Sequence, residues 1–386
     1  MEPIRPMPRK LFPALPILAT TSMSEGQDVL RYKYQYYDEQ NGRVDVQSHY
    51  LDYEHSFIDW TLGLRLAVDT LSGETPRGTH LPDDPDTWEF TNIEDERYVT
   101  VITLEKEIDD HTLTFEYARS EESDYLSNAV SLKWKSQFNE NNTTVSAGVS
   151  AAFDKVRAVG FLFEDENKDS LDLSFGISQL LSTRTILDVT LAYGHSTGYL
   201  ADPYRGISQT VLLTPDPNGP TQHFEAGENR PGSQNRWVAK VAARHYLPSQ
   251  KAAIAGSYRF FANSESLVGH TFELKWIQQV TDKLSITPYF RYYQQTAAEY
   301  YTPTLDDAKF LGFQANQGEA PFFSPDYRLS AFDATTYGVK VTYEASENLS
   351  LDLQLERYDM SGRSDLTPDI FFPSANVISV GANYTF

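Results

Sequence analysis

Apolar and polar residues alternate along most of this chain, and this period of two residues is the feature that most limits how it can fold. In 349–356 the leucines occupy the odd positions and polar or charged residues the even ones, and 187–193 and 378–386 repeat the pattern. Successive side chains of a strand face opposite ways, so each segment has one apolar and one polar face. A helix would mix these residues around its circumference, and we therefore expect β-strands.

The same pattern, followed along the whole chain, predicts about sixteen strands. Their approximate ranges are 27–39, 43–54, 57–70, 96–108, 110–120, 125–138, 142–154, 169–180, 184–197, 235–247, 250–262, 266–280, 283–297, 331–345, 348–360 and 374–386. Tight connections are predicted at 55–56, 109, 139–141, 181–183, 248–249, 281–282 and 346–347. The other set is mostly long and rich in Pro and Gly, at 71–95, 155–168, 198–234, 298–330 and 361–373, with short members at 40–42 and 263–265.

These two sets of connections alternate along the chain. In an up-and-down meander successive connections lie at opposite ends, so one end carries tight turns and the other carries long loops. Bacterial outer-membrane barrels have this asymmetry and an even number of strands. The sequence thus predicts an all-β fold, a transmembrane up-and-down antiparallel β-barrel of about 16 strands with short periplasmic turns and long extracellular loops.

The aromatic residues favour a membrane location. No apolar run reaches the roughly 18 residues of a membrane helix, but many of the 24 Tyr, 22 Phe and 5 Trp lie on the apolar strand faces near strand ends. Rings at those levels form the aromatic girdles of outer-membrane barrels. The alternative is a soluble secreted β-protein that binds polysaccharide through its tyrosines, although each Tyr hydroxyl in a soluble core would need a partner.

Charged residues of both signs occupy the opposite strand faces. A charge facing lipid near the bilayer midplane costs a few kcal/mol, so we expect these side chains to line the lumen. The expected lumenal charges are Arg65, Glu116, Lys133, Asp188, Lys240, Arg244, Glu273, Lys275, Arg291, Lys340, Asp352 and Glu356.

Composition excludes several classes of function. The absence of cysteine rules out a disulfide scaffold and a thiolate metal site. The formal net charge of −22 argues against nucleic-acid binding, which needs clustered Lys and Arg. If this net charge lines a path through the barrel, cations should pass more readily than anions.

The two ends of the chain carry targeting features. Residues 1–24 run from a basic start through the apolar stretch 11–19 to small residues, the order of a secretory signal peptide. We expect this segment to be cleaved and 25–386 to form a single outer-membrane barrel domain. The last strand ends with Tyr384 and Phe386 on its apolar face, which resembles the carboxy-terminal signal that the barrel-assembly machinery reads.

One short motif resembles a known family. Residues 69–78 read Asp-Thr-Leu-Ser-Gly-Glu-Thr-Pro-Arg-Gly, similar to the D-x-x-S-G-A-S-P-x-G signature of domain-of-unknown-function family 3570, predicted outer-membrane β-barrel proteins of Gram-negative bacteria. The resemblance implies fold and location but no activity, and Glu74 departs from the signature. We interpret the motif as a turn with glycines at positive φ rather than a ligand site. Its residues of open role are Asp69, Ser72, Gly73, Thr75, Pro76 and Gly78.

Sequence patterns of catalysis are weak. The chain has no H-E-x-x-H, G-x-S-x-G or G-x-x-x-x-G-K motif, and we expect no catalytic residue, no cofactor and no metal site. Acidic runs at 83–89, 94–96 and 164–169 contain the oxygen donors that Ca²⁺ or Mg²⁺ prefers. Their spacing does not match an EF-hand, and we interpret them as charges that keep loops soluble.

The predicted architecture favours a porin-like channel for small polar solutes or ions, because sixteen strands can enclose a water-filled bore. The alternative is a barrel filled by a partner, which would serve as a scaffold or as a secretion or electron-transfer sheath. A small lipoprotein or periplasmic protein would then be the partner. Outer-membrane lipid, lipopolysaccharide and the barrel-assembly machinery are expected contacts in either case, and nucleic acid is not.

Overall fold

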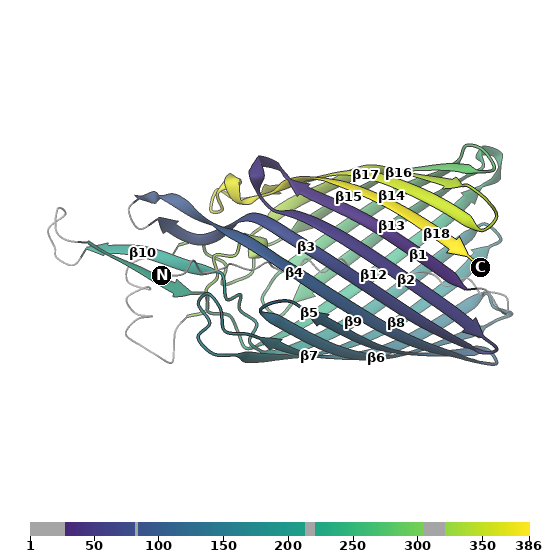
Figure 1. The fold of residues 1–386 in the computed structure, drawn as a ribbon, viewed down its shortest axis with the longest axis horizontal. Coiled ribbons are helices and arrows are strands. Elements are labelled where there is room, and N and C mark those ends of the chain that lie inside the picture. The colour runs from purple at the N-terminus through teal and green to yellow at the C-terminus, as the bar shows by residue number, and fades with distance from the viewer. Residues whose placement is uncertain (1–27, 82–83, 213–220, 305–320) are drawn as a thin grey trace.

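The computed structural model describes residues 28–81, 84–212, 221–304 and 321–386, in which sixteen strands close into one barrel (Figure 1). Its strands are β1 (Val29–Glu39), β2 (Asp45–Phe57), β3 (Trp60–Leu81), β4 (Asp84–Ile108), β5 (His111–Glu121), β6 (Tyr125–Phe138), β7 (Thr143–Val156), β8 (Glu166–Ser182), β9 (Thr185–Gly198), β12 (Ser233–Leu247), β13 (Ala252–Asn263), β14 (Val268–Gln279), β15 (Leu284–Gln295), β16 (Phe332–Glu344), β17 (Leu349–Gly362) and β18 (Ser374–Thr385). Short 3₁₀ helices are η1 (Gln40–Gly42), η2 (Pro248–Gln250), η3 (Tyr327–Leu329) and η4 (Asp369–Phe371). No helix among the described residues is long and apolar enough to cross a membrane.

The ring closes between the first and the last strand, and all neighbours in it are antiparallel. β1 pairs with β18 on one side and β2 on the other, and the backbone N–H of Phe386 donates to the Asp28 carbonyl (2.9 Å). A closed ring pairs the backbone groups of every strand, which is a condition for crossing a bilayer with strands. The predicted fold class and all sixteen predicted strands are confirmed, while the expected signal segment 1–24 lies outside the described residues.

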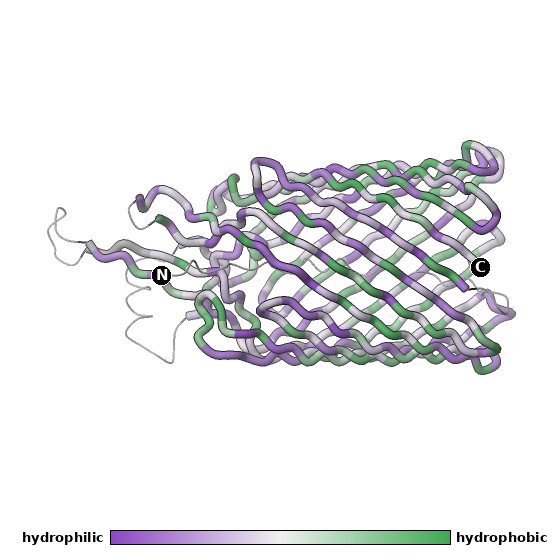
Figure 2. Tube along the Cα trace, in the orientation of Figure 1, coloured by the Kyte–Doolittle hydropathy of each residue, from purple (hydrophilic) through white to green (hydrophobic). Residues whose placement is uncertain are grey.

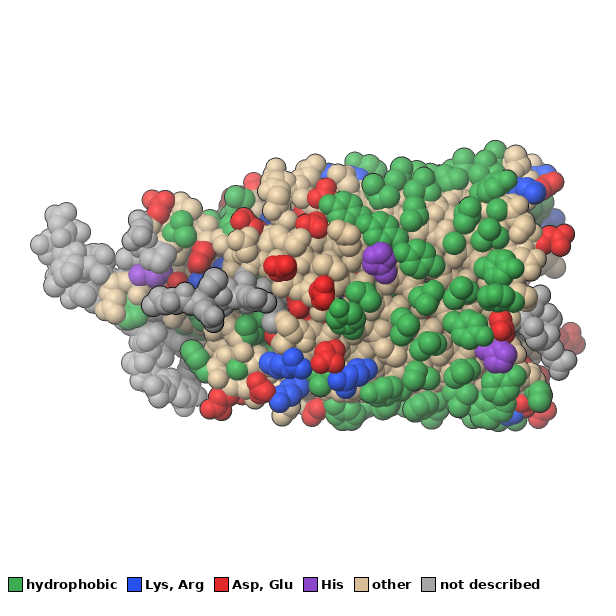
Figure 3. Space-filling view, in the orientation of Figure 1, with side chains coloured by type: hydrophobic (Ala, Val, Ile, Leu, Met, Phe, Trp, Pro, Cys, Tyr) green, Lys and Arg blue, Asp and Glu red, His purple; other side chains and the backbone are tan. Residues whose placement is uncertain are grey.

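The outer surface of the barrel is apolar where a soluble protein would be polar. On β17, Leu351, Leu353 and Leu355 point outward with 42–44% of their surface exposed. Equivalent alternate positions on the other strands give the band of hydrophobic side chains toward the short-turn end in Figure 3, and Figure 2 shows the alternation along each strand. An exposed apolar surface that continues around a closed ring has lipid as its solvent, so this is an outer-membrane barrel.

The connections sort by length as predicted. The turns at 58–59, 109–110, 139–142, 183–184, 248–251, 280–283 and 345–348 lie at one end of the barrel, the end at which Phe386 is located (Figure 1). The opposite end carries 40–44, 122–124, 157–165, 199–232, 264–267, 296–331 and 363–373. In outer-membrane barrels the short turns face the periplasm, so the second set is extracellular.

Two predicted loops are wrong in part. Segment 71–95 is not a loop, because β3 and β4 continue through it as one tall hairpin that extends beyond the other strands of the barrel (Figure 1). Segment 198–234 contains a separate hairpin of β10 (Gly206–Leu212) and β11 (Thr221–Gly227). In both places the strands have left the apolar band, so neither face meets lipid and the alternation that identifies a membrane strand is lost.

The connection 199–232 crosses the external mouth. It leaves the ring at β9, and β3 lies six strands further round. Nevertheless, Arg205 Nη2 donates to Thr75 Oγ1 on β3 (2.8 Å), and the His80 backbone N–H donates to Ser208 Oγ (2.6 Å). Contacts between such distant parts of the ring require the connection to span the opening.

Two further connections join it there. Asn229 and Phe323 exchange backbone hydrogen bonds of 3.0 and 2.8 Å, which ties 199–232 to 296–331. Phe371 of 363–373 is fully buried and meets Trp88 and Tyr327 edge-on, with ring centroids 5.0 and 6.2 Å apart. We call the described parts of 199–232, 296–331 and 363–373 the cap.

Charged side chains are buried within the cap. Arg230 pairs with Glu228 and Asp326, each at 2.9 Å, and Arg328 pairs with the same Asp326 at 2.8 Å. The side chains of Glu228 and Asp326 are only 1% and 2% exposed. Buried charges are tolerated only when they are paired, so these ion pairs hold 199–232 and 296–331 together.

A charge placed on the outer face of a strand tests whether that face meets lipid. Leu353→Arg should lower the free energy of unfolding by about 2–4 kcal/mol, because the guanidinium would face the apolar part of the bilayer. Gln354→Arg adds the same charge at the next position, where it faces the lumen, and should cost less than about 1 kcal/mol. Urea unfolding in lipid vesicles measures both, and equal losses would contradict the assigned faces.

Candidate functional site

Strand alternation places all the predicted lumenal charges on the face opposite the apolar band. They lie on β3 (Arg65), β5 (Glu116), β6 (Lys133), β9 (Asp188), β12 (Lys240, Arg244), β14 (Glu273, Lys275), β15 (Arg291), β16 (Lys340) and β17 (Asp352, Glu356). Several of these inward side chains are nevertheless solvent-exposed, namely Lys133, Lys240, Arg244 and Lys275. An exposed side chain inside a closed ring means that the lumen has room for water.

The two signs of charge occupy opposite arcs of the ring. The inward cations of β12–β16 form what we call the basic wall, made of Arg236, Lys240, Arg244, Arg259, Lys275, Arg291 and Lys340. Glu273 and Glu344, the last residue of β16, are the only inward acidic residues on these five strands, all of which the structure describes. The inward acids of β2–β5 form the acidic wall, made of Asp52, Glu54, Asp69, Asp95, Glu105, Glu107 and Glu116. The walls face each other, because β3 and β14 lie seven strands apart in the ring of sixteen.

Many lumenal charges are paired across strands. The closest pairs on the acidic wall are Arg65 with Asp52 and Arg97 with Asp69, both at 2.5 Å. On or beside the basic wall the pairs are longer: Arg236–Asp172 (3.2 Å), Lys340–Asp352 (3.2 Å), Arg291–Glu273 (3.5 Å) and Arg244–Asp188 (3.9 Å). Within the part of the chain that the structure describes, Lys240, Arg259 and Lys275 have no acidic group within ion-pair distance.

The residues of the 69–78 motif lie in the upper part of β3, not in a turn. Asp69 pairs with Arg97 on β4, and Ser72 Oγ donates to Asp45 Oδ2 on β2 (2.9 Å). Gly73 has φ +125°, and an added Cβ would lie 2.1 Å from the Arg43 carbonyl oxygen. The expected positive φ is therefore present, but it lies within a strand and lets the 40–44 connection approach β3 closely.

The second half of the motif contacts the cap. Thr75 accepts from Arg205, and Pro76 is fully buried. Gly78 has φ +91°, and an added Cβ would lie 2.7 Å from both the Gly206 carbonyl oxygen and Pro325 Cγ. The motif thus forms the part of the barrel wall against which two cap segments pack, a role that its sequence alone did not indicate.

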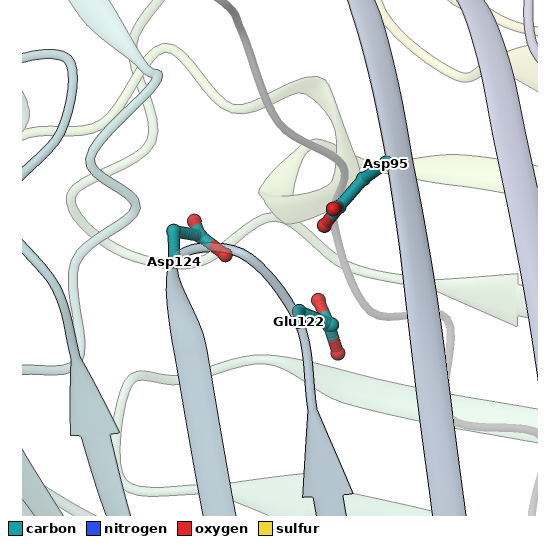
Figure 4. A group of neighbouring side chains, drawn as sticks. All are labelled: Asp95, Glu122 and Asp124. Atoms are coloured by element: carbon teal, nitrogen blue, oxygen red, sulfur yellow. The ribbon is translucent and has the colours of Figure 1, made fainter.

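A cluster of three buried carboxylates lies below the cap (Figure 4). Asp95 of β4 points toward Glu122 and Asp124 of the connection 122–124, and their nearest oxygens all lie within 4.8 Å of one another. Oxygens in such a group are the donors that hard divalent cations take. Asp95 belongs to an acidic run evident in the sequence, whereas the other two residues are brought to it only by the pairing of β4 with β5.

Residues of the cap complete this region. Tyr204 donates from its hydroxyl to Asp124 Oδ2 (3.0 Å), and burial together with the nearby carboxylates raises the pKa of this hydroxyl far above its ordinary value. The next residue, Arg205, lies over the Tyr327 ring at 5.7 Å. Burial lowers the pKa of Arg205 to about 10, so the guanidinium is still protonated at neutral pH.

The close contact of Gly78 with the cap can be tested by a substitution that adds one methyl group to this residue. Gly78→Ala should destabilise the packing of the cap by about 1–3 kcal/mol, because it combines a positive φ with two contacts that are too close. Gly232→Ala lies in the cap at a negative-φ position with its nearest contact at 3.7 Å and should have little effect. The measurement is the rate of proteolysis of the cap in membranes, and equal rates in the two variants would refute the contact.

Similar solved structures are outer-membrane barrels at low identity. CdiB from Acinetobacter baumannii has a TM-score of 0.51 at 9% identity, covering 95% of this chain. This chain spans only 61% of the CdiB chain. A structure titled bacterial polysaccharide outer membrane secretin has a TM-score of 0.50 at 8% identity, covering 93% of this chain and 98% of that one. Such likenesses show the fold alone.

Comparison of the sequence with models of protein families identifies the family to which the chain belongs. A search of curated proteins found no match. The model of the family described as "Protein of unknown function (DUF3570)" matches residues 82–165 and 162–386, which together exceed half of the chain and include most of the barrel strands. The expected resemblance is confirmed, and this outer-membrane β-barrel belongs to the DUF3570 family.

Proposed function

We propose that the protein is a porin-like channel for small polar solutes or ions, with an external mouth narrowed by its own cap. The observation that carries this proposal is the exposure of charged side chains inside the closed ring, at Lys133, Lys240, Arg244 and Lys275. Charges without protein packing around them are stable only in contact with water. A hydrated lumen through an apolar outer band is the arrangement of a diffusion channel.

The cap supports a restriction on solute size. The segment 202–208 extends from the β9 side of the mouth to β3. The buried ion pair of Arg230 with Asp326 fixes the later part of the same connection to 296–331. Solutes entering from outside must therefore pass beside an ordered assembly rather than through an open ring. Among the described residues, the connections at the periplasmic end are turns of two to four residues, so the restriction that they show lies at the external end.

The proposal predicts ion conduction by the purified protein. Refolded protein in planar bilayers should give stepwise increases in conductance, because a continuous aqueous path joins the two sides. The control is the same preparation unfolded by heat, which should give none. Folded protein with conductance no higher than that of the bare bilayer would contradict the channel.

Loosening the cap should widen this path. Asp326→Asn removes the carboxylate that Arg230 and Arg328 share, and loss of one partner of a buried pair costs about 3–5 kcal/mol. We expect larger single-channel conductance and faster proteolysis of the cap. The matched control is Asp359→Asn, which breaks a partly exposed pair with Arg357 on the outer face of β17, away from the cap ion pairs, and should change neither quantity. Unchanged conductance in Asp326→Asn would refute the restriction by the cap.

If the folded protein did not conduct ions in planar bilayers, the alternative of a barrel filled by a partner protein would be favoured. The hydrated lumen and the short periplasmic turns would then admit a segment of another protein, with the two charged walls as its binding surface. A small lipoprotein or periplasmic protein that stays bound to the barrel through purification would support this alternative.

We also propose that Tyr384 and Phe386 form the insertion signal read by the barrel-assembly machinery. Both side chains are exposed on the lipid-facing side at the periplasmic end, and their rings meet edge-on with centroids 4.8 Å apart. An apolar pair exposed on the last strand is accessible before the ring closes.

This signal predicts an effect on assembly rather than on stability. Phe386→Ala should lower the amount of heat-modifiable barrel in outer membranes several-fold, while the purified variant unfolds at nearly the same urea concentration. Phe138→Ala removes a similarly exposed ring beside the 139–142 turn and should not lower assembly. Equal assembly of both variants would show that the terminal ring is not read.

A further inference from the structure

Two cations face each other inside the barrel with no acid between them. Lys240 of β12 and Arg259 of β13 are direct cross-strand partners, and both point into the lumen. Like charges directly opposite each other destabilise a sheet. Among the described residues neither side chain has an acidic group within ion-pair distance, although most other cations of the basic wall do.

The cations next to this pair extend the same surface. Lys275 of β14 likewise has no ion pair, and its ammonium lies 5.9 Å from the centre of the Tyr289 ring. Arg291 of β15 is held by Glu273 at a distance of 3.5 Å, which leaves that pair weak. The four cations thus lie on the inner faces of four neighbouring strands, with Glu273 as the acid among them.

Aromatic rings lie beside these cations. The Arg259 guanidinium is 5.4 Å from the centre of the Phe261 ring, and the Arg291 guanidinium is 5.8 Å from that of Tyr293. Rings in these places restrict the orientation of the guanidinium groups without neutralising them. The positive ends therefore stay available to a solute in the lumen.

We propose that Lys240, Arg259, Lys275 and Arg291 form a binding track for small oxyanions, such as solutes bearing a phosphate or carboxylate group, and that the barrel prefers anions to cations. This inference rests on the proposed channel function and names its substrate class. Lysine and arginine are the side chains that bind phosphate and carboxylate oxygens, and arginine does so with two parallel hydrogen bonds. A bound oxyanion supplies the negative charge that the like-charge pair lacks.

The preference is opposite to the one expected from the net charge of −22. Part of the acidic wall is already neutralised by neighbouring cations, in the Arg65–Asp52, Arg97–Asp69 and Arg31–Glu54 pairs. In the track, Lys240, Arg259 and Lys275 have no such partner among the described residues, and Arg291 has only its 3.5 Å pair with Glu273. The charge presented to a solute in the middle of the lumen is therefore positive on the β12–β15 side, whatever the sign of the whole chain.

The first experiment measures ion selectivity. The reversal potential of the reconstituted protein in a KCl gradient should show chloride permeating more readily than potassium. Lys240→Gln and Arg259→Gln should each reduce the chloride-to-potassium permeability ratio about two- to fivefold, as expected for removing one charge next to the path. Lys251→Gln, in a periplasmic turn with its side chain 65% exposed, is the matched control and should leave the ratio unchanged.

The second experiment measures binding without conduction. Inorganic phosphate titrated into the protein in detergent micelles should bind, and the Lys240→Gln/Arg259→Gln double variant should weaken this binding at least about tenfold. The two substitutions should also raise the urea concentration needed for unfolding, because they remove a like-charge pair. A purely structural role for either cation predicts the reverse, a loss of stability.

These measurements separate failure of this inference from failure of the channel. The oxyanion track is refuted if the protein conducts potassium in preference to chloride, or if the double variant keeps the same chloride preference. Either result leaves the channel proposal intact. Phosphate binding that depends on Lys240 and Arg259 in a protein that does not conduct supports the track and refutes the channel. Absence of phosphate binding in the wild-type protein overturns the track in either case.

Discussion

The hydrogen-bonding needs of the backbone in a solvent without water determine this structure. Every N–H and C=O at the level of the bilayer must find a partner within the protein, and the antiparallel ring supplies them, down to the bond between Phe386 and Asp28 that closes it. Once the ring is closed, the outer side chains only have to be apolar. The inner side chains and the external connections are free of this constraint, and it is there that the charges, the cap and the proposed oxyanion track lie.

The same constraint explains which parts of the fold could be predicted from the sequence. A membrane strand meets lipid on one face and water on the other, so its residues alternate, and all sixteen such strands were evident. The upper parts of β3 and β4 lie beyond the apolar band, where they pack against the cap and neither face meets lipid. There the alternation disappears, and Gly73, Pro76 and Gly78 suggested a loop. In the structure, these residues instead lie within β3 and allow neighbouring segments, including the cap, to approach it closely.

The sequence was enough to predict which charged residues face the lumen, but not which of them form ion pairs. Alternation is enough to assign Lys240 or Glu273 to the inner face. Which cations lack a counter-charge depends on strand register, and a shift of two residues would give Lys240 a different partner from Arg259. The cap depends on contacts between residues more than ninety positions apart, such as Arg230 with Asp326. No local sequence pattern carries information of that kind.

The cap and the lumen contain the same kinds of side chain in opposite electrostatic situations, and the contrast bears on whether the barrel holds water. Arg230 in the cap is 13% exposed and is paired with two carboxylates, as the desolvation of a buried charge requires. Lys240 in the lumen has no such partner, faces Arg259, and is exposed. In a dry interior this arrangement would cost several kcal/mol per charge, which for two charges is comparable to the whole stability of an ordinary protein. The unpaired cations are therefore consistent with a folded barrel only if water or a bound anion reaches them, so the like-charge pair itself argues that the lumen is accessible to solutes.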